Sequence, residues 1–217
     1  MSRAIKVDIP PAPDMSAELA AYAAGCNCVC GIDEAGRGPL AGPVVAAAVV
    51  LPVGYELPGL NDSKKLTARK RELLYEHLLA DDSVQKCIAE ASVAEIDELN
   101  ILRATHLAMA RAAQGLPQVP DMCLIDGLAV PNFPLPSQNM VKGDARCLSI
   151  AAASVLAKVY RDRYMQQLAE QYPQYGFERH AGYGTKAHMN AIQQYGITPH
   201  HRRSFAPVTQ VQLSLDL

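Results

Sequence analysis

The sequence predicts one α/β domain whose mixed central sheet is flanked by helices. Short apolar segments typical of strands alternate along the chain with longer segments of helical periodicity. The apolar run 44–51 is continuous, which is typical of a strand covered on both faces. Some connections between strands are short, and short connections join antiparallel neighbours, so we expect mixed strand directions. With 217 residues, 49% of them hydrophobic, the chain can bury one sizeable core.

The first half of the chain is expected to supply two strands and a helix. Residues 1–24 are weakly patterned and predict an N-terminal tail or a short leading helix. After them we expect strands over 28–33 and 44–51, joined by the glycine-rich segment 36–43, and a helix from 67 to about 79. Thr67 is the predicted N-cap of that helix, because its hydroxyl can accept a hydrogen bond from a free amide of the first turn.

The second half is expected to alternate strands and helices again. The predicted elements are a strand over 84–91, helices over 93–99 and 101–114, a strand over 122–126, an irregular connection over 128–141 that ends in a short extended piece, a long helix over 146–171 and a short helix over 186–195. One side of the long helix carries small residues. The domain is predicted to span 25–208, followed by a C-terminal tail over 209–217.

The charge distribution is uneven although the net charge is only −2. Segment 61–71 holds five Lys or Arg against Asp62 alone, and segment 142–203 holds nine Lys or Arg against four acids. These segments predict a positive footprint for a nucleic acid. Scattered charge on solvated helix faces is an equal alternative from the counts alone.

The chain has the features of a soluble cytoplasmic protein without a membrane partner. The sequence has no apolar run near the roughly 18 residues that span a bilayer, and its first 15 residues lack the apolar stretch of a secretory signal. Three of the six cysteines sit in apolar surroundings, as expected in a reducing compartment. The cluster Cys26, Cys28 and Cys30 predicts one face of a strand; the alternative, a zinc site, would need a fourth ligand.

Two acids mark the end of the first predicted strand. Asp33 and Glu34 follow an apolar segment and precede Gly36. Buried carboxylates are costly unless a partner neutralises them, and a divalent cation such as Mg²⁺ or Mn²⁺ prefers carboxylate oxygen. A surface turn with two solvated acids is the alternative interpretation.

A third acid, Asp126, ends the short apolar strand over 122–126. Functional groups gather beyond the carboxyl ends of strands in α/β sheets, so Asp126 converges with Asp33 and Glu34 if the two strands are adjacent and parallel. Asp162, on the long helix between two arginines, is a fourth candidate, although such an acid is usually an ion-paired surface residue. Three or four converging carboxylates predict a site for two divalent ions about 3.5–4 Å apart, suited to phosphodiester hydrolysis without a protein nucleophile.

Gly36 and Gly38 lie directly after the acidic pair. Glycine lets backbone N–H and C=O groups approach a ligand closely, and a ribose 2′-OH both donates and accepts. A tight turn with no ligand is the alternative. The pair is not a dinucleotide fingerprint, because the third glycine is missing at the required spacing.

Eight motifs in order resemble the ribonuclease HII family and cover the chain from about 31 to 208. They are G-I-D-E-A-G-R-G-P-L-A-G-P-V at 31–44, D-S-K-K-L at 62–66, I-D-G at 125–127, K-G-D at 142–144, S-V-L-A-K-V-Y-R-D at 154–162, Y-P-Q-Y-G-F at 172–177, G-Y-G-T at 182–185 and H-R-R-S-F at 201–205.

The resemblance implies a ribonuclease H-like fold with a C-terminal helical extension. It also implies an endonuclease that cuts the RNA strand of RNA–DNA hybrids and nicks 5′ to single ribonucleotides in duplex DNA, leaving 3′-OH and 5′-phosphate ends and removing misincorporated ribonucleotides. The metal-binding and catalytic carboxylates it implies are Asp33, Glu34, Asp126 and Asp162.

The substrate contacts that the resemblance implies come from three places. Gly36, Arg37 and Gly38 match the turn that reads the 2′-OH, and Tyr183 matches a tyrosine that packs against the sugar at the cut site. Without the resemblance, Tyr183 reads as a loop-packing aromatic. The candidate phosphate contacts are Lys64 and Lys142 by motif position and Lys186 by charge alone.

The chain departs from the family pattern at two places. Ala181 stands where the family often has Lys, which removes one phosphate contact, and the segment around His200 and His201 differs slightly from the usual form. Ribonuclease HIII shares the fold but carries a sizeable N-terminal substrate-binding domain, and only about 30 residues precede the acidic motif here, so ribonuclease HII is preferred.

The end of the chain, Gln212–Leu217, is similar to the hexapeptide with which bacterial proteins bind the sliding clamp. Three leucines at alternate positions can enter an apolar groove from one side of an extended peptide. A frayed amphipathic terminus is the alternative. We expect a monomer whose partners are RNA–DNA hybrids, ribonucleotide-containing duplexes and a possible clamp.

Two other functions remain to be tested. One is a non-catalytic nucleic-acid-binding or clamp-associated module on the same fold, which the presence of Asp33, Glu34 and Asp126 disfavours. The other is a type 1 ribonuclease H that needs longer RNA stretches, which the G-R-G turn and Tyr183 disfavour. Activity on a single embedded ribonucleotide separates the two enzymes.

Overall fold

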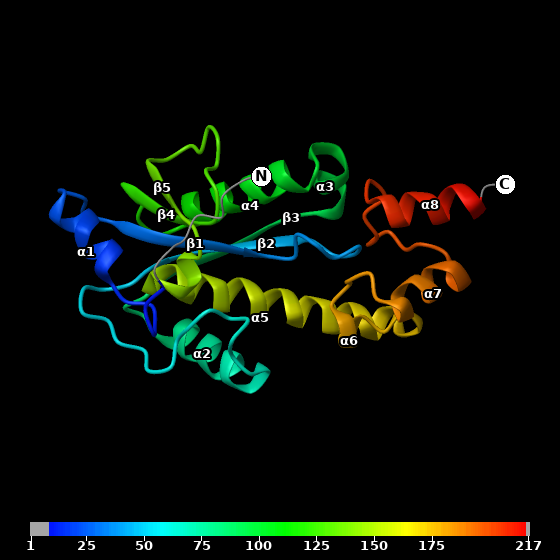
Figure 1. The fold of residues 1–217 in the computed structure, drawn as a ribbon, viewed down its shortest axis with the longest axis horizontal. Helices are drawn as coiled ribbons and strands as arrows, with labels where there is room; N and C mark the ends of the chain where they lie inside the picture. Colours follow the sequence, from blue (N-terminus) through cyan, green and yellow to red (C-terminus); the bar gives the residue numbers. More distant parts are fainter. Residues whose placement is uncertain (1–8, 216–217) are drawn as a thin grey trace.

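The computed structural model describes residues 9–215, with side chains described through residue 210, and contains one five-stranded sheet (Figure 1). The strand order is β3-β2-β1-β4-β5. The strands are β1 (Val29–Ala35), β2 (Val44–Val50), β3 (Gln85–Ala91), β4 (Met122–Asp126) and β5 (Ser137–Met140). β1 pairs antiparallel with β2 and parallel with β4, so the prediction of a mixed sheet is confirmed.

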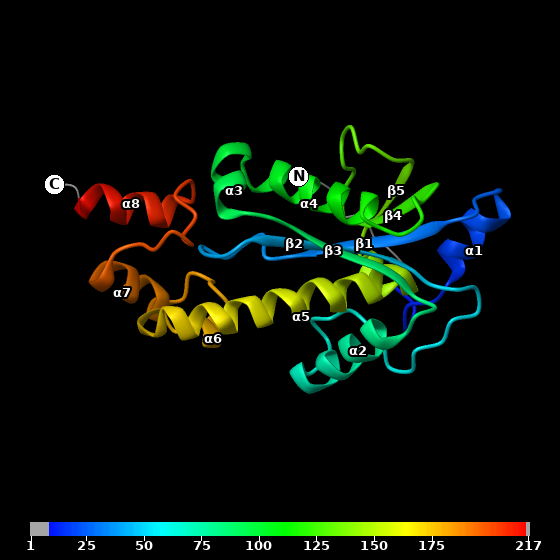
Figure 2. The same ribbon diagram turned by 180° about the vertical axis from the view of Figure 1, so that it is seen from behind.

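Helices cover both faces of the sheet, as Figures 1 and 2 show from opposite sides. On one face lie α5 (Leu148–Gln171) and, outside it, α2 (Ala68–Ala80); on the other lie α3 (Val93–Leu99) and α4 (Ile101–Gln114). The side chains of β2 divide between two apolar clusters, one shared with α5 and α2 and one shared with α4. The continuous apolar run therefore reflects burial on both faces, as predicted.

The long helix α5 packs directly against β1 at Gly31. A Cβ atom at this position would lie 2.3 Å from the backbone nitrogen of Ile150, in the first turn of α5. The small side chains of Ala151, Ala152 and Ala153 are fully buried in the same layer. The predicted small side of this helix is therefore its contact with the sheet.

Most predicted element positions are confirmed to within two residues. Thr67 caps α2, since its side-chain oxygen accepts a hydrogen bond from the amide of Lys70 at 3.3 Å. The main difference is that β1 continues to Ala35, so that Asp33 and Glu34 lie inside the strand, opposite Ala47 and Ala46 of β2. Pairing with the antiparallel neighbour extends the strand beyond its apolar part.

The segment before the sheet contains the short leading helix, α1 (Ser16–Ala23). Its Glu18 is 1% exposed and accepts a hydrogen bond at 2.8 Å from the amide of Ser149, at the start of α5. This carboxylate satisfies a free amide at the helix N-terminus. Cys30 lies in β1, and Cys28, directly before the strand, packs into the same apolar cluster, whereas Cys26 packs against another. The predicted common face thus includes two of the three cysteines, of which one is in the strand.

The C-terminal part forms a small helical layer at the far end of α5 (Figure 1). Its elements are the 3₁₀ turn η2 (Pro173–Tyr175), α6 (Phe177–His180), α7 (Lys186–Tyr195) and α8 (Ala206–Leu215). Buried Phe177, Ile192 and Val208 join it to Leu168 of α5. The predicted C-terminal helical extension is thus present. The predicted C-terminal tail over 209–217 is helical in its described part, because α8 continues to Leu215. The side chains of the peptide Gln212–Leu217 lie outside the described residues.

In the part of the chain that the structure describes, no helix combines the length and apolar character needed to cross a membrane.

Candidate active site

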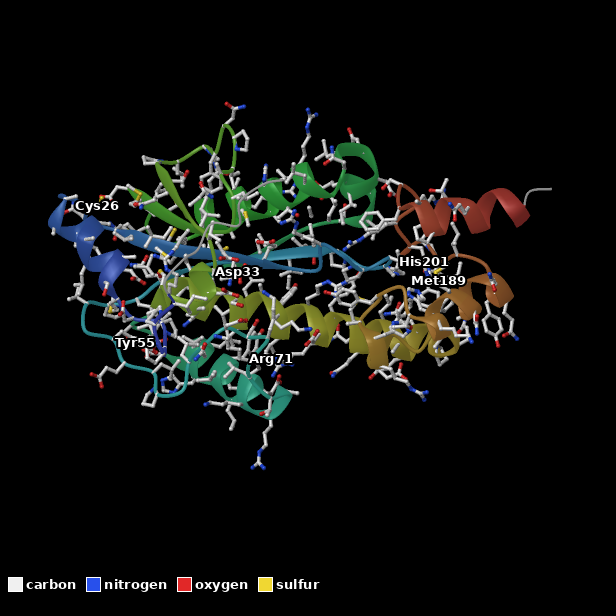
Figure 3. All side chains as sticks on the ribbon, viewed as in Figure 1. Cys26, Asp33, Tyr55, Arg71, Met189 and His201 are labelled. Atoms are coloured by element: carbon white, nitrogen blue, oxygen red, sulfur yellow. The ribbon has the colours of Figure 1, made fainter. Side chains whose placement is uncertain are left out.

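The parallel pairing of β1 and β4 places Asp33 and Asp126 side by side. Ile32 pairs with Ile125, so the next residue of each strand is an aspartate at the same edge of the sheet. Figure 3 shows Asp33 between the sheet and α5. Asp33 is 3% exposed, and burial, followed by the nearby charges of Glu34 and Asp126, raises its pKa well above the usual value.

The short 3₁₀ turn η1 (Gly143–Ala145) brings a third carboxylate, Asp144, to the same place. The amide of Gly143 donates to Oδ1 of Asp126 at 2.6 Å, which fixes the turn against the end of β4. Burial is the main cause that raises the pKa of both Asp126 and Asp144. Lys64 reaches Asp144 at 3.4 Å.

Ligand oxygens of Asp33, Asp126 and Asp144 all lie within 4.8 Å of one another. Like charges on two buried carboxylates and one half-buried carboxylate repel at this distance, and the largely exposed Lys64 does not balance them. Oxygen donors without sulfur or imidazole are the set that Mg²⁺ and Mn²⁺ prefer. The donor set therefore fits hard divalent cations.

Glu34 stands beside this group and not within it. Its carboxylate pairs with Arg37 at 3.3 Å and lines the same pocket as Asp33 and Asp126. The predicted convergence of Asp33 and Asp126 is observed, with Glu34 on the wall of the pocket.

Asp162, predicted as the fourth ligand, lies outside the group of carboxylates within 4.8 Å of one another, and Asp144, which was not predicted, lies within it. Asp162 accepts a hydrogen bond from Lys158 at 2.6 Å, one turn earlier on α5, which is the ion-paired surface role that its sequence context also allowed. Sequence reasoning missed Asp144, although the K-G-D motif at 142–144 carried the signal.

A pocket of about 290 Å³ opens beside the carboxylates. Its lining includes Asp33, Glu34, Gly36, Arg37, Gly38, Ser63, Lys64, Asp126, Lys158, Arg161 and Tyr183. The position of Lys64 is set by the D-S-K-K-L turn, where Arg71 (Figure 3) donates to the carbonyls of Ser63 and Leu66 at 2.8 and 2.6 Å. Lys158 and Arg161 are lining residues that the sequence analysis did not single out.

The G-R-G turn also lines the pocket. Gly36 has φ +98°, a conformation that favours glycine, and a Cβ there would lie 2.1 Å from Nε of Arg161. A Cβ on Gly38 would lie 3.2 Å from the ring of Tyr183. The Tyr183 side chain is 49% exposed and thus offers its ring to a ligand.

Two buried arginines, Arg161 and Arg202, hold this turn. Nη2 of Arg202 donates to the carbonyl of Gly36 at 2.6 Å, and its Nη1 donates to that of Arg37 at 3.1 Å. Nη1 of Arg161 donates to the carbonyl of Ala181 at 3.0 Å, next to the G-Y-G-T segment. Burial lowers the pKa of Arg161 to about 10 and that of Arg202 to about 9.

The other candidate lysines lie at different distances from the carboxylates. Lys142 lines a second pocket together with Lys64, Asp126 and Asp144. Lys186 is exposed at the start of α7 and lines neither pocket.

Comparison with known proteins shows which family the chain belongs to. A family model described as Ribonuclease HII matches residues 30–208. The chain belongs to the ribonuclease HII family. It is 58% identical over 197 residues to the Ribonuclease HII of Geobacillus kaustophilus (strain HTA426), a match that covers 91% of this chain and 75% of that protein.

Solved structures of this family have the same fold. The ribonuclease H2 of Pyrococcus horikoshii OT3 superposes with a TM-score of 0.74 at 26% identity, covering 88% of this chain and 99% of the other. The RNase HII in the PCNA:RNase HII complex from Archaeoglobus fulgidus superposes with a TM-score of 0.67 at 25% identity, covering 81% and 94%. The ribonuclease H-like fold is therefore confirmed, and the chain is a metal-dependent ribonuclease of the type that hydrolyses RNA–DNA hybrids.

Proposed function

We propose that this ribonuclease HII nicks duplex DNA on the 5′ side of a single embedded ribonucleotide, leaves 3′-OH and 5′-phosphate ends, and so removes misincorporated ribonucleotides. One observation carries the proposal: Asp33 and Asp126 of the carboxylate group, the G-R-G turn and Tyr183 line one pocket. A reactive centre and a sugar-reading surface in the same pocket suit cleavage at one chosen nucleotide.

The residues present would hold two divalent ions, Mg²⁺ or Mn²⁺, through Asp33, Asp126 and Asp144, with Glu34 beside them. When bound, such ions supply Lewis acidity that lowers the pKa of an attacking water and stabilises charge on the leaving 3′-oxygen. Lys64 and Lys142 flank the carboxylates and would bind phosphate oxygens of the cleaved strand.

Substrate choice falls to the backbone of the G-R-G turn and to the ring of Tyr183. Because the carbonyls of Gly36 and Arg37 already accept hydrogen bonds from Arg202, the turn keeps one conformation before the substrate arrives. A 2′-OH placed there meets preorganised polar groups, whereas a deoxyribose leaves them unpaired. Tyr183 would pack against the sugar.

The deciding experiment incubates a short DNA duplex containing one ribonucleotide with the enzyme and Mg²⁺, Mn²⁺ or EDTA. We expect a metal-dependent nick 5′ to the ribonucleotide and none in EDTA. Cleavage restricted to long RNA–DNA hybrids would indicate a type 1-like specificity. Binding without cleavage under every condition would indicate the non-catalytic module.

A second proposal concerns a partner: the C-terminal peptide Gln212–Leu217 binds a sliding clamp in the cell, in a cytoplasm that keeps the six free cysteines reduced. Its Q-L-S-L-D-L sequence and the complex of the Archaeoglobus fulgidus relative with PCNA support it. Deletion of these six residues is expected to abolish clamp binding and to leave cleavage of short duplexes unchanged. Retained clamp affinity would refute the assignment.

A further inference from the structure

A chain of buried hydrogen bonds leads through two histidines to Tyr183. The amide of Thr198 donates to Nδ1 of His201 at 2.9 Å. Nε2 of His201 lies 3.0 Å from Nε2 of His188, and Nδ1 of His188 lies 2.9 Å from the carbonyl oxygen of Tyr183. Both imidazoles are at most 1% exposed, and Figure 3 places His201 in the C-terminal extension.

The two ends of this chain fix every proton within it. A carbonyl oxygen only accepts, so Nδ1 of His188 carries the proton that it donates to Tyr183. A backbone amide only donates, so Nδ1 of His201 carries none, and the proton of its ring is on Nε2. His201 therefore donates to His188. Each ring is neutral, in agreement with burial, which lowers the pKa of His188 to about 4 and that of His201 to about 3.

A third histidine supports the same segment from the other side. The amide of Gly182 donates to Nδ1 of His180 at 3.2 Å, and Nε2 of His180 lies 2.9 Å from the carbonyl oxygen of Tyr175. The ring of His180 stacks on that of His188, with centroids 4.6 Å apart. The backbone on both sides of Tyr183 is thus held by imidazoles whose own orientation is fixed.

Burying two imidazoles in an otherwise apolar core costs free energy unless each ring nitrogen has a hydrogen-bond partner. What they hold is the carbonyl of a residue whose side chain points into the pocket and meets Gly38. Because the hydrogen bonds run in one direction, from the amide of Thr198 to the carbonyl of Tyr183, that carbonyl accepts a hydrogen bond from His188. An apolar side chain at this position would leave it without a donor.

We propose that His188 and His201 are positioning residues for substrate recognition: their relay holds the backbone of Tyr183 so that its ring keeps its place over Gly38, where the ribose is read. This proposal rests on the proposed function. A shift of about 1 Å in a positioning group can cost on the order of 100-fold in rate, so a small loosening of Tyr183 is expected to be measurable.

A matched pair of substitutions at His188 tests the relay. The side-chain amide of His188→Asn can place an N–H near the position of Nδ1 and keep the bond to Tyr183, whereas His188→Gln reaches toward Nε2 and leaves that bond unmade. We expect kcat/KM on a one-ribonucleotide duplex to fall about 10- to 100-fold for His188→Gln and less than about 3-fold for His188→Asn. The control Ile192→Ala removes buried volume from the same helix and is expected to lower Tm with little change in kcat/KM.

A double-mutant cycle separates positioning from general stability. In a Tyr183→Ala background the relay has no ring left to position, so His188→Gln is expected to cause no further loss of kcat/KM. An equal loss in both backgrounds would overturn the proposal. If His188→Gln does not fold, His201→Asn serves in its place, because it keeps an acceptor for the Thr198 amide and loses the donor to His188.

A measurement that needs no catalysis completes the test. The ¹⁵N chemical shifts of the imidazoles at neutral pH should report a proton on Nδ1 of His188 and on Nε2 of His201. Opposite tautomers or a charged ring would overturn the relay. Because these shifts do not depend on the substrate, a wild-type enzyme that fails to nick the one-ribonucleotide duplex would refute the proposed function while leaving the relay itself measurable.

Discussion

At the scale of single residues, Asp33 combines two properties that rarely occur together: it is buried and it neighbours other carboxylates. Burial and the charges of Glu34 and Asp126 raise its pKa, so its ionised form is unfavourable without a cation. The same features prepare it to bind a divalent ion, since the ion removes the repulsion that the fold imposes. The fold therefore favours binding of a cation at Asp33.

The first prediction distinguishes Asp144 from Asp162. Asp144→Asn is expected to lower kcat/KM on a one-ribonucleotide duplex by on the order of 100-fold or more, because it removes a ligand, and even substitutions behind metal ligands cost about 10- to 100-fold. Asp162→Asn leaves the carboxylate group intact and is expected to change kcat/KM less than about 5-fold. The reverse order of the two effects would restore Asp162 as the fourth ligand.

The second prediction concerns stability without ions. Asp33→Asn removes one of the repelling charges and can still accept the hydrogen bond from the amide of Glu34, so its Tm in EDTA is expected to exceed that of the wild type. At a Mg²⁺ concentration of 100 times the dissociation constant, binding should add about 2.7 kcal/mol to the free energy of unfolding of the wild type and so raise its Tm. The Tm of the variant should rise less. A variant that melts below the wild type in EDTA would contradict this account.

At the scale of elements, the segment 36–43 depends on the C-terminal extension for its shape. Its backbone is bonded to that extension through Leu40, whose amide donates to the carbonyl of Gly182 at 2.8 Å and whose carbonyl accepts from the amide of Arg202 at 2.8 Å. The guanidinium of Arg202 then binds the carbonyls of Gly36, Arg37, Pro39, Gly42 and Pro43. The conformation of the G-R-G turn therefore depends on contacts with a segment that is distant in the sequence.

The third prediction tests this dependence with Arg202→Lys. Lysine has three donors for the carbonyls that the guanidinium binds, and each buried carbonyl left unpaired costs about 1–3 kcal/mol, so we expect a loss of at least about 2 kcal/mol in the free energy of unfolding. Because the G-R-G turn loosens, KM for the one-ribonucleotide duplex is expected to rise as well. Arg203→Lys, at the exposed neighbouring position, is the matched control and should change neither quantity.

At the scale of the whole molecule, α5 joins the carboxylates to the extension. Its first turn packs against Gly31 of β1. In its middle, Arg161 donates to the carbonyls of Pro43 and Ala181, in the two segments that flank the pocket. Near its end, Leu168 belongs to the apolar core of the extension. One element thus sets the distance between the carboxylate group and the pocket wall of Gly36, Gly38 and Tyr183, for which we propose a role in sugar recognition. The histidine relay lies at the far end of this element.

The fourth prediction is a pH dependence of stability that originates in the extension. In the unfolded chain His188 and His201 take up protons near pH 6.5, but in the folded protein they resist protonation until about pH 4 and about pH 3. The unfolded state therefore binds more protons in this window, and stability falls as the pH drops below 6.5, by at most about 1.4 kcal/mol per pH unit for each ring.

Thermal melts between pH 7 and pH 4 measure this slope. The double variant His188→Asn, His201→Gln lacks both titrating groups, so the difference in slope between the wild type and the variant isolates their contribution from that of the carboxylates. Identical slopes would show that these rings titrate in the same way in the folded and unfolded chains.

The sequence by itself determined the elements and half of the site. Helical periodicity and the Thr67 cap set α2, and apolar runs ending in acids marked Asp33 and Asp126, because these signals lie between residues that are neighbours in the chain. The ordered motifs identified the family and pointed to Tyr183 and the G-R-G turn, which the structure places in the lining of one pocket.

Only the tertiary structure decided which acid completes the carboxylate group and which residues hold the G-R-G turn and Tyr183 in place. Asp144 sits in a three-residue turn with no periodicity, and its approach to Asp33 depends on strand pairing and on the bond from Gly143 to Asp126, whereas Asp162 had the more conspicuous helical motif. The buried partners of Arg202 and His188 are backbone carbonyls, which every residue possesses. A sequence cannot name such partners, because what selects them is position in space.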